Sequence, residues 1–198
     1  DDVMNAVKAA LGGRPGPAVL EVPLDVQSRI NDAEIGASQD DGQADDPELQ
    51  SRLETGVSDI VEALREAERP VIISGFGVKC AGQSNNLRQL IEAEDLPVAL
   101  TWPMADFLPF DHRLNCGRFG VVAKRHPNMI LQKADFVLVL GSRLDNIQTA
   151  FNADRFARQA KTFVVDIDTA ELRKMPEKVT TYHLDLSALV PMLSSRLK

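Results

Sequence analysis

Two glycines that follow an apolar run are the first candidates for phosphate chemistry in this sequence. Gly75 and Gly77 come directly after residues 71–74, with Phe76 between them. Glycines at a strand-to-helix turn let the backbone pass close to a phosphate, and the helix N-terminus adds partial positive charge. The spacing to Gly82 is G-x-G-x-x-x-x-G rather than G-x-G-x-x-G, so a tight turn without a ligand explains these glycines equally well.

A cation and two carboxylates follow two later apolar runs. Arg143 comes after residues 136–140, where its guanidinium can bind a diphosphate through two parallel hydrogen bonds. A surface ion pair of Arg143 with Asp145 or Asp166 is the alternative. Asp166 and Asp168 end another apolar run, where a carboxylate either binds a ribose or caps the next helix.

Other catalytic classes find no support in the residue spacing. His112, His126 and His183 have no metal-ligand spacing to one another, to a cysteine or to an acid, which argues against zinc. Cys80 and Cys116 form no C-x-x-C pair, so we interpret both as buried or half-buried thiols. The sequence has no G-x-S-x-G elbow, P-loop or H-E-x-x-H motif, and no basic run with interleaved aromatics. Hydrolase, kinase and nucleic-acid-binding functions are therefore disfavoured.

From residue 70 onward, the elements that must position these residues alternate between strand and helix. Apolar runs predict strands at 71–74, 97–100, 136–140, 162–167 and 179–184. Helical spacing predicts helices at 47–67, 84–95, 123–132, 154–161 and 187–197, with a loop containing a short helix at 103–122. The alternation predicts a doubly wound, Rossmann-like α/β fold of three layers around a parallel sheet, in which ligands meet the carboxyl ends of the strands.

The acidity of the chain is concentrated before this alternating region. Residues 31–59 hold nine acids against one base, a net charge of −8 in a chain whose formal net charge is −7. The segment 31–46 predicts a solvated linker, because it lacks apolar periodicity. Residues 1–12 predict a helix and 18–22 a short strand, an arm that must pack on something else. No apolar run is long enough to span a bilayer, so we expect no membrane partner and a cytoplasmic location.

Several segments, in this order, resemble the acetolactate synthase group of thiamine diphosphate-dependent enzymes. They are GRPGPAVLEVPLDVQ, RPVIISGFG, LPVALTWPMADFLP, HPNMILQKADFVLVLGSRLDNIQT and KTFVVDID. The resemblance identifies residues 1–30 as the end of a pyrimidine-binding domain and 47–198 as a central domain, joined by the linker at 31–46. It implies a full-length transferase or decarboxylase that decarboxylates a 2-oxo acid and joins or releases the carbonyl fragment.

The same resemblance implies that the chemistry needs other parts of the enzyme. The family's cofactor-activating glutamate lies upstream and its G-D-G metal and diphosphate motif downstream, and neither is found in these 198 residues. We therefore expect thiamine diphosphate and Mg²⁺ to be bound outside this chain, and no catalysis from the chain alone. The expected partners are the remaining pyrimidine and diphosphate domains of the same enzyme, in a homodimer or homotetramer.

In this family the central domain holds FAD, or in one branch ADP, at the strand ends. The resemblance implies contacts from Gly75, Phe76, Gly77, Thr101, Trp102, Arg118, Phe119, Gly141, Ser142, Arg143, Asp145, Asp166, Ile167, Asp185 and Leu186. Where flavin-binding members read G-A-R-F-D-D-R-V-T-G, this chain reads GSRLDNIQTA, so Ile147 replaces an arginine and Ala150 a glycine. A stand-alone regulatory module that binds an adenine nucleotide and a purely structural assembly domain are the alternative functions. The sequence does not identify the 2-oxo acid.

Overall fold

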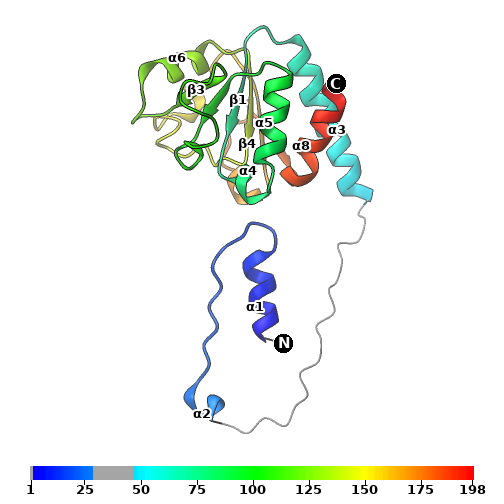
Figure 1. Ribbon diagram of the computed structural model, residues 1–198, viewed down its shortest axis with the longest axis vertical. Coiled ribbons are helices and arrows are strands. Elements are labelled where there is room, and N and C mark those ends of the chain that lie inside the picture. The colour runs from blue at the N-terminus through cyan, green and yellow to red at the C-terminus, as the bar shows by residue number, and fades with distance from the viewer. Residues whose placement is uncertain (1, 29–46) are drawn as a thin grey trace. The chain divides into compact units, whose positions relative to one another are not determined.

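The computed structural model describes residues 2–28 and 47–198, and the chain divides into two units, 1–46 and 47–198 (Figure 1). In the first unit, α1 (Asp2–Leu11) confirms the expected helix, and α2 (Leu24–Gln27) is one short turn that the sequence analysis did not predict. The strand predicted at 18–22 is wrong: these residues have no regular secondary structure and Val19 is 87% exposed. A strand needs a partner for its backbone groups, and the described residues of this unit supply none. The linker predicted at 31–46 lies outside the described residues.

The second unit is a six-stranded parallel sheet in the order β3-β2-β1-β4-β5-β6. The strands are β1 (Pro70–Ser74), β2 (Val98–Leu100), β3 (Asn115–Arg118), β4 (Phe136–Leu140), β5 (Lys161–Asp166) and β6 (Thr180–His183). This order is that of a doubly wound sheet, whose strand order reverses between β1 and β4. The predicted fold class is confirmed.

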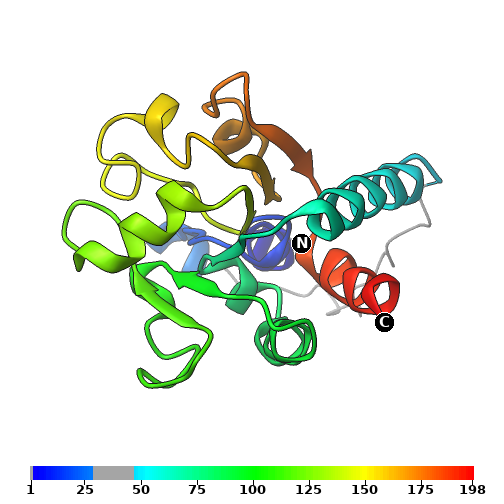
Figure 2. The same cartoon turned by 90° about the horizontal axis from the view of Figure 1, so that it is seen from above.

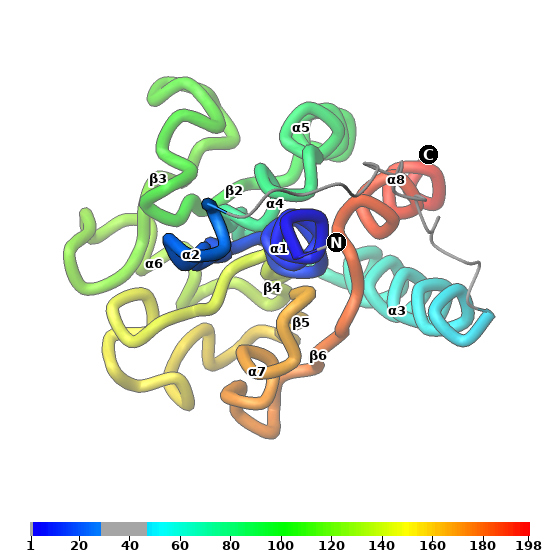
Figure 3. The backbone as a smooth tube through the Cα atoms, turned by 90° about the horizontal axis from the view of Figure 1, so that it is seen from below, coloured from blue at the N-terminus to red at the C-terminus, as the bar shows by residue number. Residues whose placement is uncertain are grey.

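Helices cover both faces of the sheet (Figures 2 and 3). One core packs α3 (Pro47–Glu66), α5 (Ser84–Ala93) and α8 (Leu186–Leu197) against the sheet. The other core holds residues of α6 (Arg125–Lys133) and α7 (Thr169–Leu172). The remaining helical elements are α4 (Gly77–Cys80) and two short 3-10 turns, η1 (Trp102–Met104) and η2 (Ala153–Arg155). No described helix has the length and apolar character needed to cross a membrane.

The two central strands, β1 and β4, are buried on both faces, which explains why apolar runs in the sequence predicted them. Ile72 and Leu138 contribute to one core, and Ile73 and Val139 contribute to the other. A strand buried on both faces needs an unbroken apolar run, which is what residues 136–140 provide. The predicted bounds of that strand are confirmed.

Two sequence predictions in the second unit are wrong. The helix predicted at 154–161 is absent, because after η2 the backbone extends at Phe156, whose ring packs 5.9 Å from that of Phe119 in the core. β3 lies in the stretch expected to form a loop. It is an edge strand in which only Cys116 is fully buried, so it lacks the apolar pattern by which the other strands were found.

Candidate functional site

The loops that follow β1 and β4 meet backbone to backbone where the strand order reverses. The amide of Gly75 donates to Leu140 O (2.9 Å), and the amide of Gly77 donates to Gly141 O (3.0 Å). A Cβ atom on Gly75 would lie 2.2 Å from Gly141 O, and Gly141 itself has φ +58°. The close contact between the two loops therefore requires these glycines. This agrees with the tight-turn explanation of Gly75 and Gly77 given by the sequence. Because two of the turn's amides are already engaged, a phosphate here depends on nearby cations.

A tryptophan and an arginine stack at the ends of β2 and β3. The Arg118 guanidinium carbon lies 4.5 Å from the centre of a Trp102 ring, and Trp102 is 46% exposed. Thr101 is buried and its hydroxyl donates to Ser74 O (3.2 Å). Phe119 is 1% exposed and belongs to the core, so its ring is not accessible to a ligand. An exposed indole of this kind can stack on a planar ring.

The loop after β4 presents one unpaired cation. Asp145 Oδ1 accepts hydrogen bonds from the amides of Ile147 (3.0 Å) and Gln148 (2.9 Å), so this carboxylate closes a turn. Ser142 is buried and its hydroxyl donates to the Gln148 side chain (3.1 Å). Arg143 is exposed, and its side chain makes no hydrogen bond or ion pair within the described residues. The alternative ion pairs with Asp145 or Asp166 are therefore not formed.

The predicted residues at the ends of β5 and β6 hold the backbone in place. Asp168 and Asp185 cap α7 and α8, each by accepting a hydrogen bond from the amide two residues later (2.8 Å). Asp166 Oδ1 accepts from the amide of Asp168 (2.9 Å). Ile167 is half-buried and Leu186 is buried. The capping role of Asp168 was one of the two interpretations of its position.

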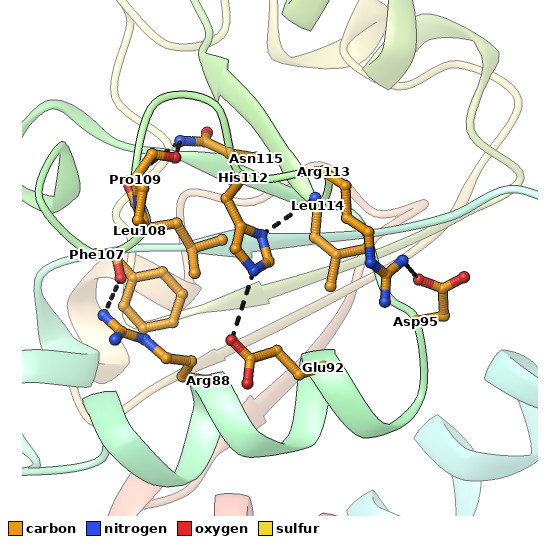
Figure 4. Close-up of polar contacts among 10 residues, drawn as sticks. All are labelled: Arg88, Glu92, Asp95, Phe107, Leu108, Pro109, His112, Arg113, Leu114 and Asn115. Atoms are coloured by element: carbon orange, nitrogen blue, oxygen red, sulfur yellow. Dashed lines mark hydrogen bonds and ion pairs between the residues drawn. The ribbon is translucent and has the colours of Figure 1, made fainter.

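Side chains of α5 and of Asp95, just after it, hold the connection between β2 and β3 (Figure 4). His112 Nε2 lies 3.5 Å from Glu92 Oε1, and Arg113 forms an ion pair with Asp95. The Arg88 side chain donates to the carbonyl oxygen of Phe107. These three contacts hold residues 107–113, which lie in the same connection as Trp102, just after β2, and lead to Arg118 at the end of β3.

A cavity of about 320 Å³ opens beside the β4 and β5 ends. It is lined by Arg143, Leu144, Asp145, Asn146, Thr149, Ala153, Phe156, Thr162, Glu171, Lys174, Met175, Pro176 and Val179. Of these only Arg143 and Asp145 were predicted from the sequence. Glu171 is 9% exposed and pairs with Lys174 Nζ (2.7 Å). One sequence signal could have indicated this ion pair. Glu171 and Lys174 stand three residues apart, shortly after the residue that caps α7.

Metal and thiol chemistry find little support in the described residues. Across residues 2–28 and 47–198, no group of three or more histidine, cysteine or acidic residues is placed to hold a metal ion. Burial raises the pKa of the Cys116 thiol to about 11, so this thiol is protonated at neutral pH. Cys80 is exposed, unlike the half-buried thiol expected.

The family model and the curated relatives that match this chain describe the same kind of enzyme. Residues 57–193 match the family described as "Thiamine pyrophosphate enzyme, central domain". The chain is 32% identical over 196 residues to the large subunit of acetolactate synthase isozyme 1 of Escherichia coli, covering 97% of this chain and 34% of that protein. It is 31% identical to the acetolactate synthase large subunit of Lactococcus lactis (96% and 33% covered) and 29% identical to acetolactate synthase 2, chloroplastic, of Nicotiana tabacum (99% and 29% covered). The chain spans about a third of the length of these relatives.

Proposed function

Since the chain belongs to the thiamine pyrophosphate enzyme central-domain family, we propose that it is the nucleotide-holding domain of an enzyme that decarboxylates a 2-oxo acid and transfers or releases the carbonyl fragment. Similarity to acetolactate synthase large subunits along nearly the whole chain supports this proposal. Thiamine diphosphate, when bound with Mg²⁺ by other domains, supplies the decarboxylation chemistry. The complete enzyme is a cytoplasmic homodimer or homotetramer.

The observation that carries the nucleotide assignment is the unpaired Arg143 at the switch point of the sheet. Arg143 follows β4, at the edge where Gly75 and Gly77 follow β1. In this proposal its guanidinium binds the diphosphate of FAD or ADP, and the exposed face of Trp102 stacks on the planar ring. The residues present suit such a ligand. They offer an arginine that has no partner in the described part of the chain, an exposed tryptophan, and a connection between β2 and β3 that is held to α5.

Trp102 makes the proposal directly testable, because it is the only tryptophan in the chain. FAD and ADP are titrated separately into the protein while Trp102 emission is recorded, with thermal stability as a second readout. We expect saturable quenching and a raised melting temperature with at least one of the two nucleotides. Arg143→Ala should weaken binding by about 1.5–3 kcal/mol, the scale of a hydrogen bond to a charged group. The matched control, Arg158→Ala, removes another exposed arginine, outside the site, and should leave affinity unchanged.

A gain-of-function variant tests the same site from the opposite direction. Ile147 occupies the position of the second arginine in flavin-binding members, and its side chain is 49% exposed. Its backbone is fixed independently of the side chain, through the Asp145 carboxylate and the Val121 amide. Ile147→Arg should therefore fold normally and raise FAD or ADP affinity about tenfold through a second charge-assisted contact.

The outcomes separate the rival functions. If neither nucleotide changes Trp102 emission or the melting temperature, and Ile147→Arg does not create binding, the nucleotide assignment is wrong and a structural domain is favoured. The enzymatic part of the proposal is tested on the protein that carries this chain together with its flanking domains. With thiamine diphosphate and Mg²⁺ it should consume pyruvate or another 2-oxo acid. Nucleotide binding without any 2-oxo acid turnover would favour a regulatory module.

A further inference from the structure

The connection between β4 and β5 covers its face of the sheet incompletely. In a doubly wound fold a helix normally packs over the sheet between successive strands. Residues 141–160 form only the short 3-10 turn η2. The cavity of about 320 Å³ lies under this connection and reaches Thr162 near the start of β5. It therefore extends along the sheet face, away from the glycine loops at the carboxyl edge.

The backbone of this connection adopts conformations that are rare for residues with side chains. Leu144, Ala150, Phe151 and Ala157 all have positive φ, between 43° and 58°. Leu144 lines the cavity, and the other three lie in the same connection, near the lining residues Thr149, Ala153 and Phe156. Strained backbone of this kind persists only where the surroundings impose it, and it concentrates around ligand-binding sites.

The cavity lining mixes apolar with polar and charged residues. Phe156, Met175 and Val179 supply apolar wall, and all three are at least partly buried against the core. At the rim, the Lys174 charge is neutralised by Glu171. The Asp145 carboxylate is occupied by two backbone amides, so Asp145 serves as a turn cap at this rim. These pairings leave Arg143 as the rim cation that has no partner within the described residues.

We propose that this cavity binds a small monocarboxylate with an apolar body, whose carboxylate pairs with Arg143 and whose body lies against Phe156, Met175 and Val179. At about 30 Å³ for each water-sized group, the volume admits a ligand of about ten non-hydrogen atoms. Two features favour this class: Arg143 offers a charge-assisted contact to an anion, and Phe156, Met175 and Val179 offer a surface to an apolar body.

Octanoate, which has an apolar chain and one carboxylate, is the probe. Its binding to the chain is measured by titration calorimetry, beside 1-octanol and octylamine, which keep the chain length but replace the anion with a neutral or a cationic group. Octanoate should bind saturably with one site per chain. Octanol should bind about tenfold more weakly because it lacks the charge-assisted contact, and octylamine should give no saturable binding.

Variants locate the site. Val179→Phe fills the cavity from the wall, and Ala153→Phe fills it from an exposed rim position that tolerates a larger side chain. Each should weaken octanoate binding at least tenfold. Arg143→Gln should weaken octanoate to the level of octanol and leave octanol unchanged, whereas Arg158→Gln should alter neither.

Two results would overturn the proposal: no saturable octanoate binding at millimolar concentration, or full binding in both cavity-filling variants whose circular dichroism is native. If Val179→Phe fails to fold, Ala153→Phe alone decides the location. The carboxylate proposal shares Arg143 with the nucleotide proposal but does not depend on a nucleotide, because its other contacts are the cavity walls. Octanoate binding in a protein that ignores FAD and ADP would support the carboxylate proposal and refute only the nucleotide proposal.

Discussion

Replacing Ala150 with glycine should stabilise the protein, although glycine substitutions usually destabilise. Ala150 is exposed and has φ +54°, in the left-handed region where a Cβ atom is crowded by the backbone. It is also the position at which flavin-binding members of the acetolactate synthase group carry glycine. The strain at this residue is therefore a property of the chain that a single substitution removes.

The expected magnitude follows from two opposing terms. Relief of the left-handed conformation is worth about 1–2 kcal/mol for an L-residue. The greater freedom of glycine in the unfolded chain offsets about 0.4–1 kcal/mol of that gain. The net stabilisation by Ala150→Gly is thus about 0.8 kcal/mol from the middle of both ranges, with an upper bound of about 1.6 kcal/mol. For a domain of this size, about 0.8 kcal/mol raises the melting temperature by about 2–3 °C.

A matched variant shows whether the sign comes from backbone conformation. Ala105 is also exposed but has φ −59° and ψ −22°, in the ordinary right-handed region. Ala105→Gly should lower stability by about 0.5–1 kcal/mol. Urea unfolding of both variants, followed by Trp102 emission, compares the two free energies of unfolding directly. If Ala150→Gly destabilises as much as Ala105→Gly, the left-handed conformation assigned to Ala150 is wrong.

Three further perturbations have clear directions. Gly75→Ala should lower the free energy of unfolding by about 3 kcal/mol, because its Cβ atom would overlap the Gly141 backbone; native stability in thermal denaturation would contradict the loop contact. Burial raises the pKa of Asp135, but hydrogen bonds from two backbone amides just before β1 outweigh it and lower that pKa below its ordinary 3.8. This stabilisation is present above pH 3.8 and is lost as the pH falls through the folded pKa. Asp135→Asn should therefore reduce the loss of unfolding free energy at acid pH. An unchanged pH dependence would contradict the lowered pKa of Asp135. In native protein at pH 8, a thiol reagent should modify exposed Cys80 rapidly and Cys116, with its pKa of about 11, only on unfolding; equal rates in single-cysteine variants would be evidence against the burial of Cys116.

The sequence predicted the parts of the fold that depend on burial of continuous apolar runs. The β4 run at 136–140 was located to the residue, because a parallel strand covered on both faces admits few polar side chains. The edge strand β3 escaped prediction because an edge strand needs little apolar sequence. The helix predicted at 154–161 failed because a long-range contact of Phe156 with Phe119 outweighs local helical spacing.

The sequence indicated which residues of the candidate site lie at strand ends. It did not indicate which hydrogen bonds their side chains form. The crevice rule placed Trp102 and Arg143 at one edge of the sheet without any structure. It could not show that Asp145 and Asp185 use their carboxylates as turn and helix caps, since a carboxylate at a strand end has the same sequence signal in either role. The sequence did not predict Glu171 as a lining residue of the cavity. The cavity forms because the connection between β4 and β5, residues 141–160, has no α-helix over the sheet, and no local sequence pattern indicates that.

Several departures from local rules fall within one connection, residues 141–160. It lacks the covering helix, it holds four non-glycine residues at positive φ, and it contributes Arg143, an arginine without a partner among the described residues. Backbone strain costs stability, so a segment selected for stability alone would lose it. Its coincidence with a cavity and with that arginine favours a bound anion as the compensating interaction. It follows that octanoate at a hundredfold excess over its Kd should stabilise the native chain by about 2.7 kcal/mol, more than Ala150→Gly does.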